Sequence, residues 1–169
     1  MFDFEKVQKD IRMTREEAKA LYDCASRVPE KGVIVEIGTL GGGSAYILWQ
    51  GKQRGVEIYT IDDYIKEGID LKKTLANLYF WGFRNQIHVI KGDSVEIGLQ
   101  WKKPIDLLFI DGGHDYEQVK KDIQAWAPHV KDEGIVCFHD YKSWDGVTKA
   151  VDEFFDTEDS QLVGSLLIL

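Results

Sequence analysis

The stretch VIVEIGTLGGGS, from Val33 to Ser44, decides the fold of this 169-residue chain. It starts as an apolar run typical of a buried strand, reaches an acidic residue at Glu36 and ends in a turn dense in glycine. Glycine allows positive φ angles and a close approach of the backbone to a ligand, and the first N–H groups of the next helix face that ligand. Because a carboxylate repels a pyrophosphate and attracts an ammonium or sulfonium, the stretch predicts a small ligand with a positive group.

Apolar runs rich in β-branched residues alternate with segments of helical periodicity along the rest of the chain. The runs are too continuous for a sheet with one face in water, so they are interpreted as buried parallel strands. They lie at Val33 to Ile37, Val56 to Ile61, Ile87 to Ile90, Ile105 to Ile110, Gly134 to Phe138 and Leu162 to Leu169, the last divided by a turn at Gly164. The alternation predicts an α/β fold with a doubly wound, mostly parallel sheet, helices on both faces and a short antiparallel C-terminal strand.

Helices are placed from their end signals and apolar spacing. Thr14 and Glu17 have the spacing of a capping box, so an opening helix is expected to begin there and to run toward Pro29. Three more are predicted from apolar stripes that should face the core: Leu71, Leu75, Leu78 and Tyr79; Tyr116, Val119, Ile123, Trp126 and Val130; and Val147, Val151 and Phe154. The pattern is weakest at Lys66–Asp70 and Asp156–Ser160, which are interpreted as loops.

Residues 1–169 are expected to form a single domain, with residues 1–30 as a helical lead-in. The formal net charge is −8, from 21 basic and 29 acidic residues, and no basic run occurs, which argues against a nucleic acid or an anionic membrane as partner. No apolar run is typical of a signal peptide or membrane span, so a cytoplasmic location is expected. Cys24 and Cys137 lie in a predicted helix and strand and are expected to be reduced core residues.

Polar residues, most of them acidic, stand at the end of each predicted parallel strand. In a doubly wound sheet the ligand lies at the carboxyl ends of the strands, so these residues belong to one rim. Asp62 ends the second strand, where nucleotide-binding folds place the acid that accepts hydrogen bonds from ribose hydroxyls. In chain order, the rim contains Glu36, then Asp62 and Asp63, then Asp93 and Ser94, then Asp111, and finally His139 and Asp140.

These residues resemble the class I S-adenosylmethionine-dependent methyltransferases, and within them the small O-methyltransferase branch of the methyltransferase-24 type. The resemblance covers nearly the whole chain and implies a Rossmann-like sheet. It rests on five blocks in order: the turn from Glu36 to Ser44, the strand end Tyr59–Asp62, Gly92–Ser94, the segment Phe109–Tyr116 with the sequence FIDGGHDY, and Gly134–Asp140. The fourth block is the most specific, because in this branch it borders both the cofactor and the methyl acceptor.

The resemblance implies that the rim holds S-adenosylmethionine. The glycine-rich turn would bind the methionine part of the cofactor, Asp62 the ribose, and Asp93 with Ser94 the edge of the adenine. Carboxylates suit a ligand with an ammonium, a sulfonium and hydroxyls, because charge-assisted hydrogen bonds are strong. The cofactor-binding residues expected on this basis are Glu36, Gly38, Thr39, Gly42, Ser44, Asp62, Asp63, Asp93, Ser94 and Asp111.

Methyl transfer also requires that the acceptor lose a proton, and two devices could remove it. His114 could act as general base, with Asp111 beside it, since histidine exchanges protons near neutral pH. Alternatively, Asp111, His139 and Asp140 could bind a divalent cation that lowers the pKa of the acceptor hydroxyl. An imidazole in this set favours Mn²⁺ or Zn²⁺ over Mg²⁺. The acceptor is expected to be an oxygen of a small molecule or sugar, and Trp144 could wall its pocket.

Other interpretations remain open. The domain could bind a cofactor or nucleoside without catalysis and act through a partner, because so short a chain leaves few residues for an acceptor pocket. A homo-oligomer, in which a second subunit completes that pocket, is a related expectation. An NAD-dependent oxidoreductase would carry Gly-x-Gly-x-x-Gly after the first strand, which the sequence from Gly38 does not match. Simpler roles are helix capping by Asp62 or Asp140 and loop stabilisation by His114.

Overall fold

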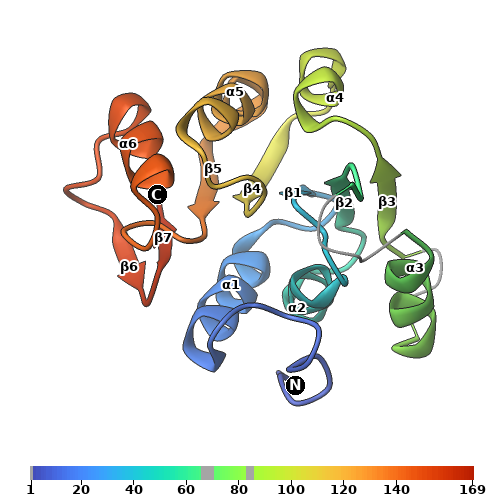
Figure 1. The fold of residues 1–169 in the computed structure, drawn as a ribbon. Coiled ribbons are helices and arrows are strands. Elements are labelled where there is room, and N and C mark those ends of the chain that lie inside the picture. The colour runs from blue at the N-terminus through green and yellow to red at the C-terminus, as the bar shows by residue number, and fades with distance from the viewer. Residues whose placement is uncertain (1, 66–70, 83–85) are drawn as a thin grey trace.

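The computed structural model describes residues 2–65, 71–82 and 86–169, so the predicted loop Lys66–Asp70 lies outside the described residues. The described residues form a seven-stranded sheet with the order β3-β2-β1-β4-β5-β7-β6 (Figure 1). Strand β7 runs antiparallel to both neighbours, and the pairs from β3 to β5 are all parallel. The strands are β1 (Val33–Ile37), β2 (Glu57–Asp62), β3 (His88–Lys91), β4 (Ile105–Ile110), β5 (Val130–Phe138), β6 (Gln161–Val163) and β7 (Leu166–Ile168).

Helices cover both faces of this sheet (Figure 1). Apolar residues of α1 and α2 share one buried cluster with the sheet, and α5 and α6 contribute to a second cluster on the other face. The helices are α1 (Arg15–Arg27), α2 (Gly43–Gly51), α3 (Leu71–Phe80), α4 (Ser94–Gln100), α5 (Tyr116–Trp126) and α6 (Asp145–Phe154), with a 3₁₀ turn, η1 (Ala127–His129). The predicted α/β fold is confirmed, and the strand order reverses between β1 and β4, where such sheets bind their ligands.

Two predicted boundaries were wrong at one connection. The helix predicted to reach Val130 ends at Trp126, because Pro128 lacks an N–H to continue it and a 3₁₀ turn follows. Strand β5 then begins at Val130 rather than Gly134, and its pairing with β4 shifts register after Ile105. The short helix α4 was not predicted, since its seven residues are too few for an apolar stripe to register.

The stripe predicted on α3 was also wrong in part. Leu78 is buried, but Leu75 and Tyr79 are exposed, and the other buried residue of the helix is Thr74. Thr74 Oγ1 donates a hydrogen bond to the Leu40 carbonyl, 2.6 Å away, so the helix is oriented by polar contacts with the glycine-rich turn. Hydrophobic spacing alone could not predict that rotation.

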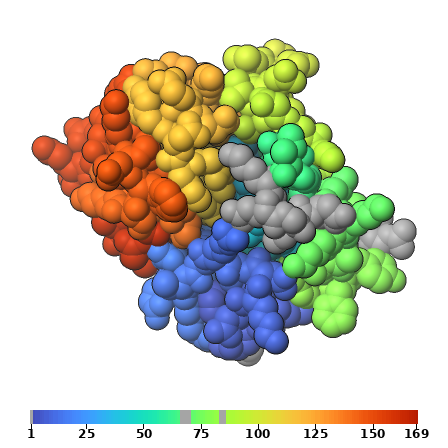
Figure 2. All heavy atoms as spheres, in the orientation of Figure 1, coloured from blue at the N-terminus to red at the C-terminus, as the bar shows by residue number. Residues whose placement is uncertain are grey.

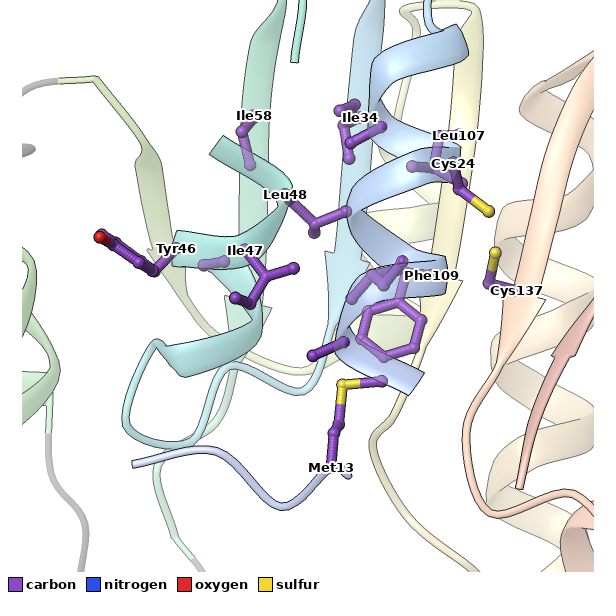
Figure 3. Packing of buried hydrophobic residues seen from close by; sticks show 14 of the residues in the cluster. Met13, Cys24, Ile34, Tyr46, Ile47, Leu48, Ile58, Leu107, Phe109 and Cys137 are labelled. Carbon is purple, nitrogen blue, oxygen red and sulfur yellow. The ribbon is translucent and has the colours of Figure 1, made fainter. Parts of the chain in front are cut away.

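The two cysteines are buried and free, as predicted. Cys24 of α1 and Cys137 of β5 point toward each other in the core, close to Leu107 and Phe109 (Figure 3). A hydrogen bond between the two thiols lowers the pKa of Cys24 and raises that of Cys137. Among the helices that the structure describes, none has the length and apolar character needed to cross a bilayer.

Candidate active site

A cavity of about 390 Å³ lies at the carboxyl ends of the parallel strands. This volume is within the range of small-molecule sites. Of the described residues, the cavity is lined by most of those that the sequence predicted: Gly38, Thr39, Ser44, Asp62, Asp63, Asp93, Ser94, Asp111, His114, His139 and Asp140. Glu36 and Gly42 are not among its lining residues. The structure therefore brings the predicted rim together around one space.

The glycine turn, defined here as Gly38–Gly42, is shaped by neighbouring protein as well as by the cavity. Gly38 has a φ of +94°, and a Cβ there would overlap the carbonyl of Asp111. Gly42 has a φ of +84°, and its Cβ would point to Leu78 and Thr74 of α3, at 3.3 to 3.5 Å. These glycines are required because β4 and α3 approach the turn closely.

Asp62 holds the glycine turn in place. Its Oδ2 accepts hydrogen bonds from the N–H groups of Thr39 and Leu40, both at 2.9 Å, and its Oδ1 accepts one from Tyr64 at 2.7 Å. A carboxylate offers about four acceptor positions, so three of them are used within the protein. Asp63 lines the cavity beside it and accepts one N–H, from Ile65 at 2.9 Å. Ribose binding by Asp62 stays a prediction, and counted over the described residues Asp63 accepts fewer hydrogen bonds than Asp62.

Glu36 is fully buried directly beneath this turn. Burial raises the pKa of its carboxyl to about 8, although the hydroxyls of Ser44 and Thr60 favour the charged form. Within the described part of the chain, its Oε1 has no hydrogen-bond partner of normal geometry. A buried acceptor without a donor is destabilising, so this oxygen suits a ligand that brings a positively charged donor. Ser44 lines the cavity and also hydrogen-bonds Glu36.

The opposite end of the cavity is bounded by α4 and α5. Asp93 caps α4, accepting the Glu96 N–H at 2.9 Å, and Ser94 Oγ donates to Asp122 Oδ1 at 2.5 Å. Gln118 donates to the other oxygen of Asp122 at 3.1 Å. Gln118 and Asp122 were missed in the sequence, because they lie on a helix stripe that was judged by its apolar members. Adenine binding by Asp93 and Ser94 stays a prediction.

Four side chains form an acid-histidine cluster on the β4 and β5 side of the cavity: Asp111, His114, His139 and Asp140. His139 Nδ1 lies 3.2 Å from Asp111 Oδ1 and 3.5 Å from Asp140 Oδ2. His114 Nε2 lies 3.0 Å from the same oxygen of Asp140. One ligand atom from each of Asp111, His139 and Asp140 lies within 4.8 Å of the others, as a shared metal ion would require.

The charges of this cluster are interdependent. Burial alone would lower the pKa of His139, but its hydrogen bonds and attraction to Asp111 and Asp140 raise it to about 10. Burial raises the pKa of Asp111, whereas the hydrogen bond to His139 lowers that of Asp140. In the absence of a cation, therefore, the cluster favours a protonated His139 between carboxylates.

The side chain of Asp140 does not cap the helix that follows it, and His114 packs on an aromatic ring. Within the described residues, the N-cap of α6 is Trp144, with no side-chain hydrogen bond, so the predicted alternative of capping by Asp140 was wrong. His114 stacks on Trp144 with ring centroids 4.8 Å apart and an interplanar angle of 17°. Trp144 is 51% exposed and lines the cavity, and its role as a wall of an acceptor pocket stays a prediction.

The sequence missed a buried acid that reaches the cluster from α1. Glu17 Oε2 lies 3.7 Å from His139 Nε2, and its two oxygens accept hydrogen bonds from the backbone and hydroxyl of Thr14 and of Ser165. Burial alone would raise the pKa of Glu17, but these hydrogen bonds lower it to about 2. Figure 2 shows the N-terminal residues, in blue, against the orange and red C-terminal ones. The capping-box spacing predicted the role of Glu17 at the start of α1 but not its proximity to His139.

The N-terminal segment was missed as well. The cavity is also lined by three residues that come shortly before α1 in the chain: Asp10, Ile11 and Arg12. They pack against the start of α2, because a Cβ at Gly43 would lie 2.8 Å from the Ile11 Cβ. No motif marks this segment in the sequence, and only the folded chain places it beside the glycine turn.

Comparison with known proteins agrees with this geometry. Residues 35–141, well over half of the chain, match the family Methyltransf_24, described as a methyltransferase domain. The uncharacterised protein R132 of Acanthamoeba polyphaga mimivirus is 31% identical over 117 residues, which are 65% of this chain and 52% of that protein. The chain thus spans about half the length of this viral relative.

Solved structures share the fold. Methyltransferase PaMTH1 of Podospora anserina, with S-adenosylhomocysteine (SAH) bound, has a TM-score of 0.72 at 17% identity, and the match covers 98% of this chain and 83% of that one. The O-methyltransferase from Bacillus cereus, in complex with SAH, has a TM-score of 0.70 at 19% identity, with 97% and 87% covered. At these identities the likeness concerns the fold.

Proposed function

The chain belongs to the methyltransferase-domain family with a class I fold, and we propose that it transfers the methyl group of S-adenosylmethionine to an oxygen of a small-molecule or sugar acceptor. The observation that carries this proposal is the position of the acid-histidine cluster, which lines the same cavity as the glycine turn. One side of the cavity thus offers recognition of a nucleoside and amino-acid ligand, and the other offers groups that exchange protons.

The residues present fit S-adenosylmethionine. Ser44 lines the cavity and hydrogen-bonds Glu36, a buried carboxyl with one oxygen lacking a donor, so this end of the cavity would attract the cofactor ammonium. Asp62 and Asp63 end β2 on the cavity, where ribose hydroxyls need acceptors. When bound, the cofactor supplies a methyl group on a sulfonium, which leaves as a neutral thioether. The protein's task is then to align the acceptor with that methyl group and to remove a proton.

We assign proton removal to His114. Its Nε2 lies 3.0 Å from Asp140 Oδ2, so the neutral imidazole donates from Nε2 and keeps Nδ1 as an acceptor. The Trp144 ring covers one face of the imidazole and restricts its rotation. An acceptor hydroxyl that enters beside Trp144 would give its proton to Nδ1 of His114.

A divalent cation is a further part of the proposal. Asp111, His139 and Asp140 would hold it, and it would lower the pKa of the acceptor hydroxyl. Two carboxylates and an imidazole suit Mn²⁺ or Zn²⁺ better than Mg²⁺, which prefers oxygen ligands. Because His139 binds a metal only in its neutral form, the cation must displace the proton held there.

Isothermal titration with S-adenosylmethionine and SAH, followed by an assay of SAH formation, tests the proposal. We expect micromolar binding of both ligands, and turnover with hydroxylated small molecules or sugars but not with amines. Adding Mn²⁺, Zn²⁺ or a chelator measures the contribution of the cation. Absence of binding would contradict the cofactor, and binding without turnover of any hydroxylated acceptor would favour a non-catalytic module that acts through a partner.

A further inference from the structure

The charges that line the cavity are strongly unequal. The acids facing it come from the N-terminal segment, the strand ends and α5: Asp10, Asp62, Asp63, Asp93, Asp111, Asp122 and Asp140. Among the lining residues that the structure describes, Arg12 is the one lysine or arginine. The acids suit a ligand with several hydrogen-bond donors, and Arg12 suits an anionic group on the same ligand. A guanidinium binds carboxylates through two parallel hydrogen bonds, so its position suggests where a carboxylate belongs.

We infer that Arg12 binds the carboxylate of the amino-acid part of S-adenosylmethionine. The inference rests on the proposed function, because it assumes that this cofactor occupies the cavity. It adds a residue from outside the methyltransferase-family match, which begins at residue 35. It also explains why an otherwise acidic cavity accepts a ligand that is itself partly anionic.

The packing of the N-terminal segment places Arg12 at the glycine turn. The space beside Gly43 is filled by Ile11, whose Cβ would lie 2.8 Å from an added Cβ. Asn77 of α3 donates one hydrogen bond to the Gly41 carbonyl at 2.9 Å and another to Asp10 Oδ1 at 3.4 Å. The segment that carries Arg12 is therefore fixed on both sides to the turn that begins α2.

Glu36 indicates where the ammonium of the cofactor would bind, which is the end of the cavity beside the glycine turn and Arg12. Glu36 Oε1 is one of two buried side-chain atoms without a hydrogen-bond partner in the described residues, the other being Tyr64 Oη, and Ser44, which hydrogen-bonds Glu36, lines the cavity. An ammonium bound there fixes the carboxylate within a few ångströms, because both groups are bonded to the same carbon atom of an amino acid. The carboxylate then lies near the start of α2 and near Arg12.

The start of α2 also favours an anion. Its N-cap is Gly42, which has no side chain to cap the helix, and none of Gly43–Tyr46 is acidic. The first N–H groups of a helix and its dipole stabilise negative charge within the first turn. Arg12 thus adds a charged partner to an electrostatic environment that already suits a carboxylate.

A pair of ligands isolates this contact. SAH carries the carboxylate, whereas 5′-methylthioadenosine has the same nucleoside and thioether without the amino-acid part. We would titrate both into the wild type, Arg12→Ala and Arg12→Lys. Arg12→Ala should weaken SAH binding by about 10- to 100-fold and leave methylthioadenosine within about twofold, because only SAH loses a charge-assisted contact. Arg12→Lys should weaken SAH less, since it keeps the charge without the paired geometry.

Arg15→Ala is the matched control. Arg15 follows by three residues, pairs with Glu5 and is not among the residues that line the cavity. The Arg15→Ala variant removes the same charge from the same part of the chain, and it should change neither the affinity for SAH nor that for methylthioadenosine. The inference is wrong if Arg12→Ala weakens the binding of SAH and of methylthioadenosine equally, because the effect would then be structural. It is also wrong if Arg12→Ala and Arg15→Ala weaken SAH binding equally, because the effect would then be a long-range electrostatic one.

The remaining outcomes separate the inference from the proposed function. If the wild type binds neither ligand, the proposed function fails before any variant is made. If the wild type binds SAH and Arg12→Ala binds it equally well, the inference alone is wrong. In that case, a lower affinity of Arg12→Ala for carboxylate-bearing acceptors than for neutral ones would reassign the arginine to an anionic acceptor.

Discussion

The glycine turn and the acid-histidine cluster line the same cavity, yet the protein balances their polar groups in different ways. In the turn, neutral backbone groups are paired with nearby side chains: Asp62 accepts two N–H groups, and Thr74 and Asn77 donate to two carbonyls. In the cluster, ionisable side chains depend on one another, with two imidazoles among the carboxylates. The hydrogen bonds of the glycine turn fix its backbone conformation. The charges of the acid-histidine cluster can be redistributed by proton transfer or by a bound cation.

This difference has consequences for mutation. A change in the turn removes a hydrogen bond or a fixed backbone angle, so it should lower stability by a modest amount, and it should lower ligand affinity only where the changed residue lines the cavity. If the cluster removes the acceptor proton as proposed, a change in it should alter turnover far more than binding. The four predictions that follow test this separation, in order of decreasing effect.

The largest effect is expected for His114→Ala. If His114 is the general base, the variant should lose about 10² to 10⁴ in kcat while keeping its SAH affinity. The reason is that the imidazole contributes to proton removal and not to the glycine turn. Rates of SAH formation and a titration with SAH measure the two quantities.

His88→Ala is a suitable control for that experiment. His88 is an exposed histidine that stacks on Tyr59, with ring centroids 4.5 Å apart, and it does not line the cavity. It should retain wild-type turnover. Parallel losses of turnover and SAH affinity in His114→Ala would mean that His114 stabilises the loop, and the separation between the two regions would fail.

The second prediction concerns Glu17 and acid pH. At neutral pH Glu17→Gln should lower the free energy of unfolding by about 1 to 3 kcal/mol, since an ionised acceptor of four hydrogen bonds is lost. The pKa of Glu17 is about 2 in the folded protein, against 4.5 ordinarily. The stabilisation is therefore complete above pH 4.5 and is lost as the pH falls toward 2.

Denaturant unfolding of the wild type and Glu17→Gln between pH 7 and pH 2.5 measures this. The difference between the two proteins should shrink as the pH falls below 4.5. Glu16→Gln, next to it but outside the buried network, should show no such change. A difference that is constant with pH would mean that packing, and not the charge of Glu17, connects α1 to β7 and His139.

The third prediction separates the two acids that end β2. Asp62→Asn should lower both the melting temperature and the SAH affinity, by about 1 to 3 kcal/mol in binding, because the N–H groups of Thr39 and Leu40 lose a charged acceptor. Asp63→Asn should lower affinity with little change in stability if Asp63 binds ribose. Thermal unfolding and titration of both variants decide the assignment. Unchanged affinity in both would remove β2 from the cofactor site.

Much of the fold could be predicted from the sequence, for an identifiable reason. Strands β1 and β4 are buried on both faces, so nearly every residue in them is apolar and the sequence records the burial directly. Helix α3 differs, because Thr74 and Asn77 set its orientation through hydrogen bonds that leave no apolar pattern. The end of α5 is marked in the sequence by Pro128, although the apolar stripe itself continues to Val130.

The site divides in a similar way. Residues at strand ends, such as Asp62, Asp111 and His139, could be predicted because strand order alone brings them to one rim. Arg12 and Glu17 could not, because they enter from the N-terminal segment and α1, and their distance from the rim depends on how those elements pack. Side chains that reach a site from elements outside the sheet do not stand at a fixed place relative to a strand end, so no sequence pattern predicts them.

The smallest effect is expected at Gly42, and it tests how far the glycine turn is built for a ligand. The sequence predicts that the backbone at Gly42 approaches the cofactor, so that a β-branched side chain there, as in Gly42→Val, would obstruct it. The structure directs a Cβ there toward Leu78 and Thr74 at 3.3 to 3.5 Å, and Gly42 does not line the cavity. Gly42→Ala should therefore cost about 1 kcal/mol of stability, because alanine disfavours a φ of +84°, and should leave SAH affinity unchanged.

Gly38→Ala provides the contrast, since its Cβ would overlap the Asp111 carbonyl and displace β4 from the turn. It should reduce stability more than Gly42→Ala and should also disturb the acid-histidine cluster through Asp111. Melting temperatures and SAH titrations of both variants measure the effect. Loss of SAH binding in Gly42→Ala at unchanged stability would place the cofactor against Gly42 after all, and the turn would then be shaped more by its ligand than by α3.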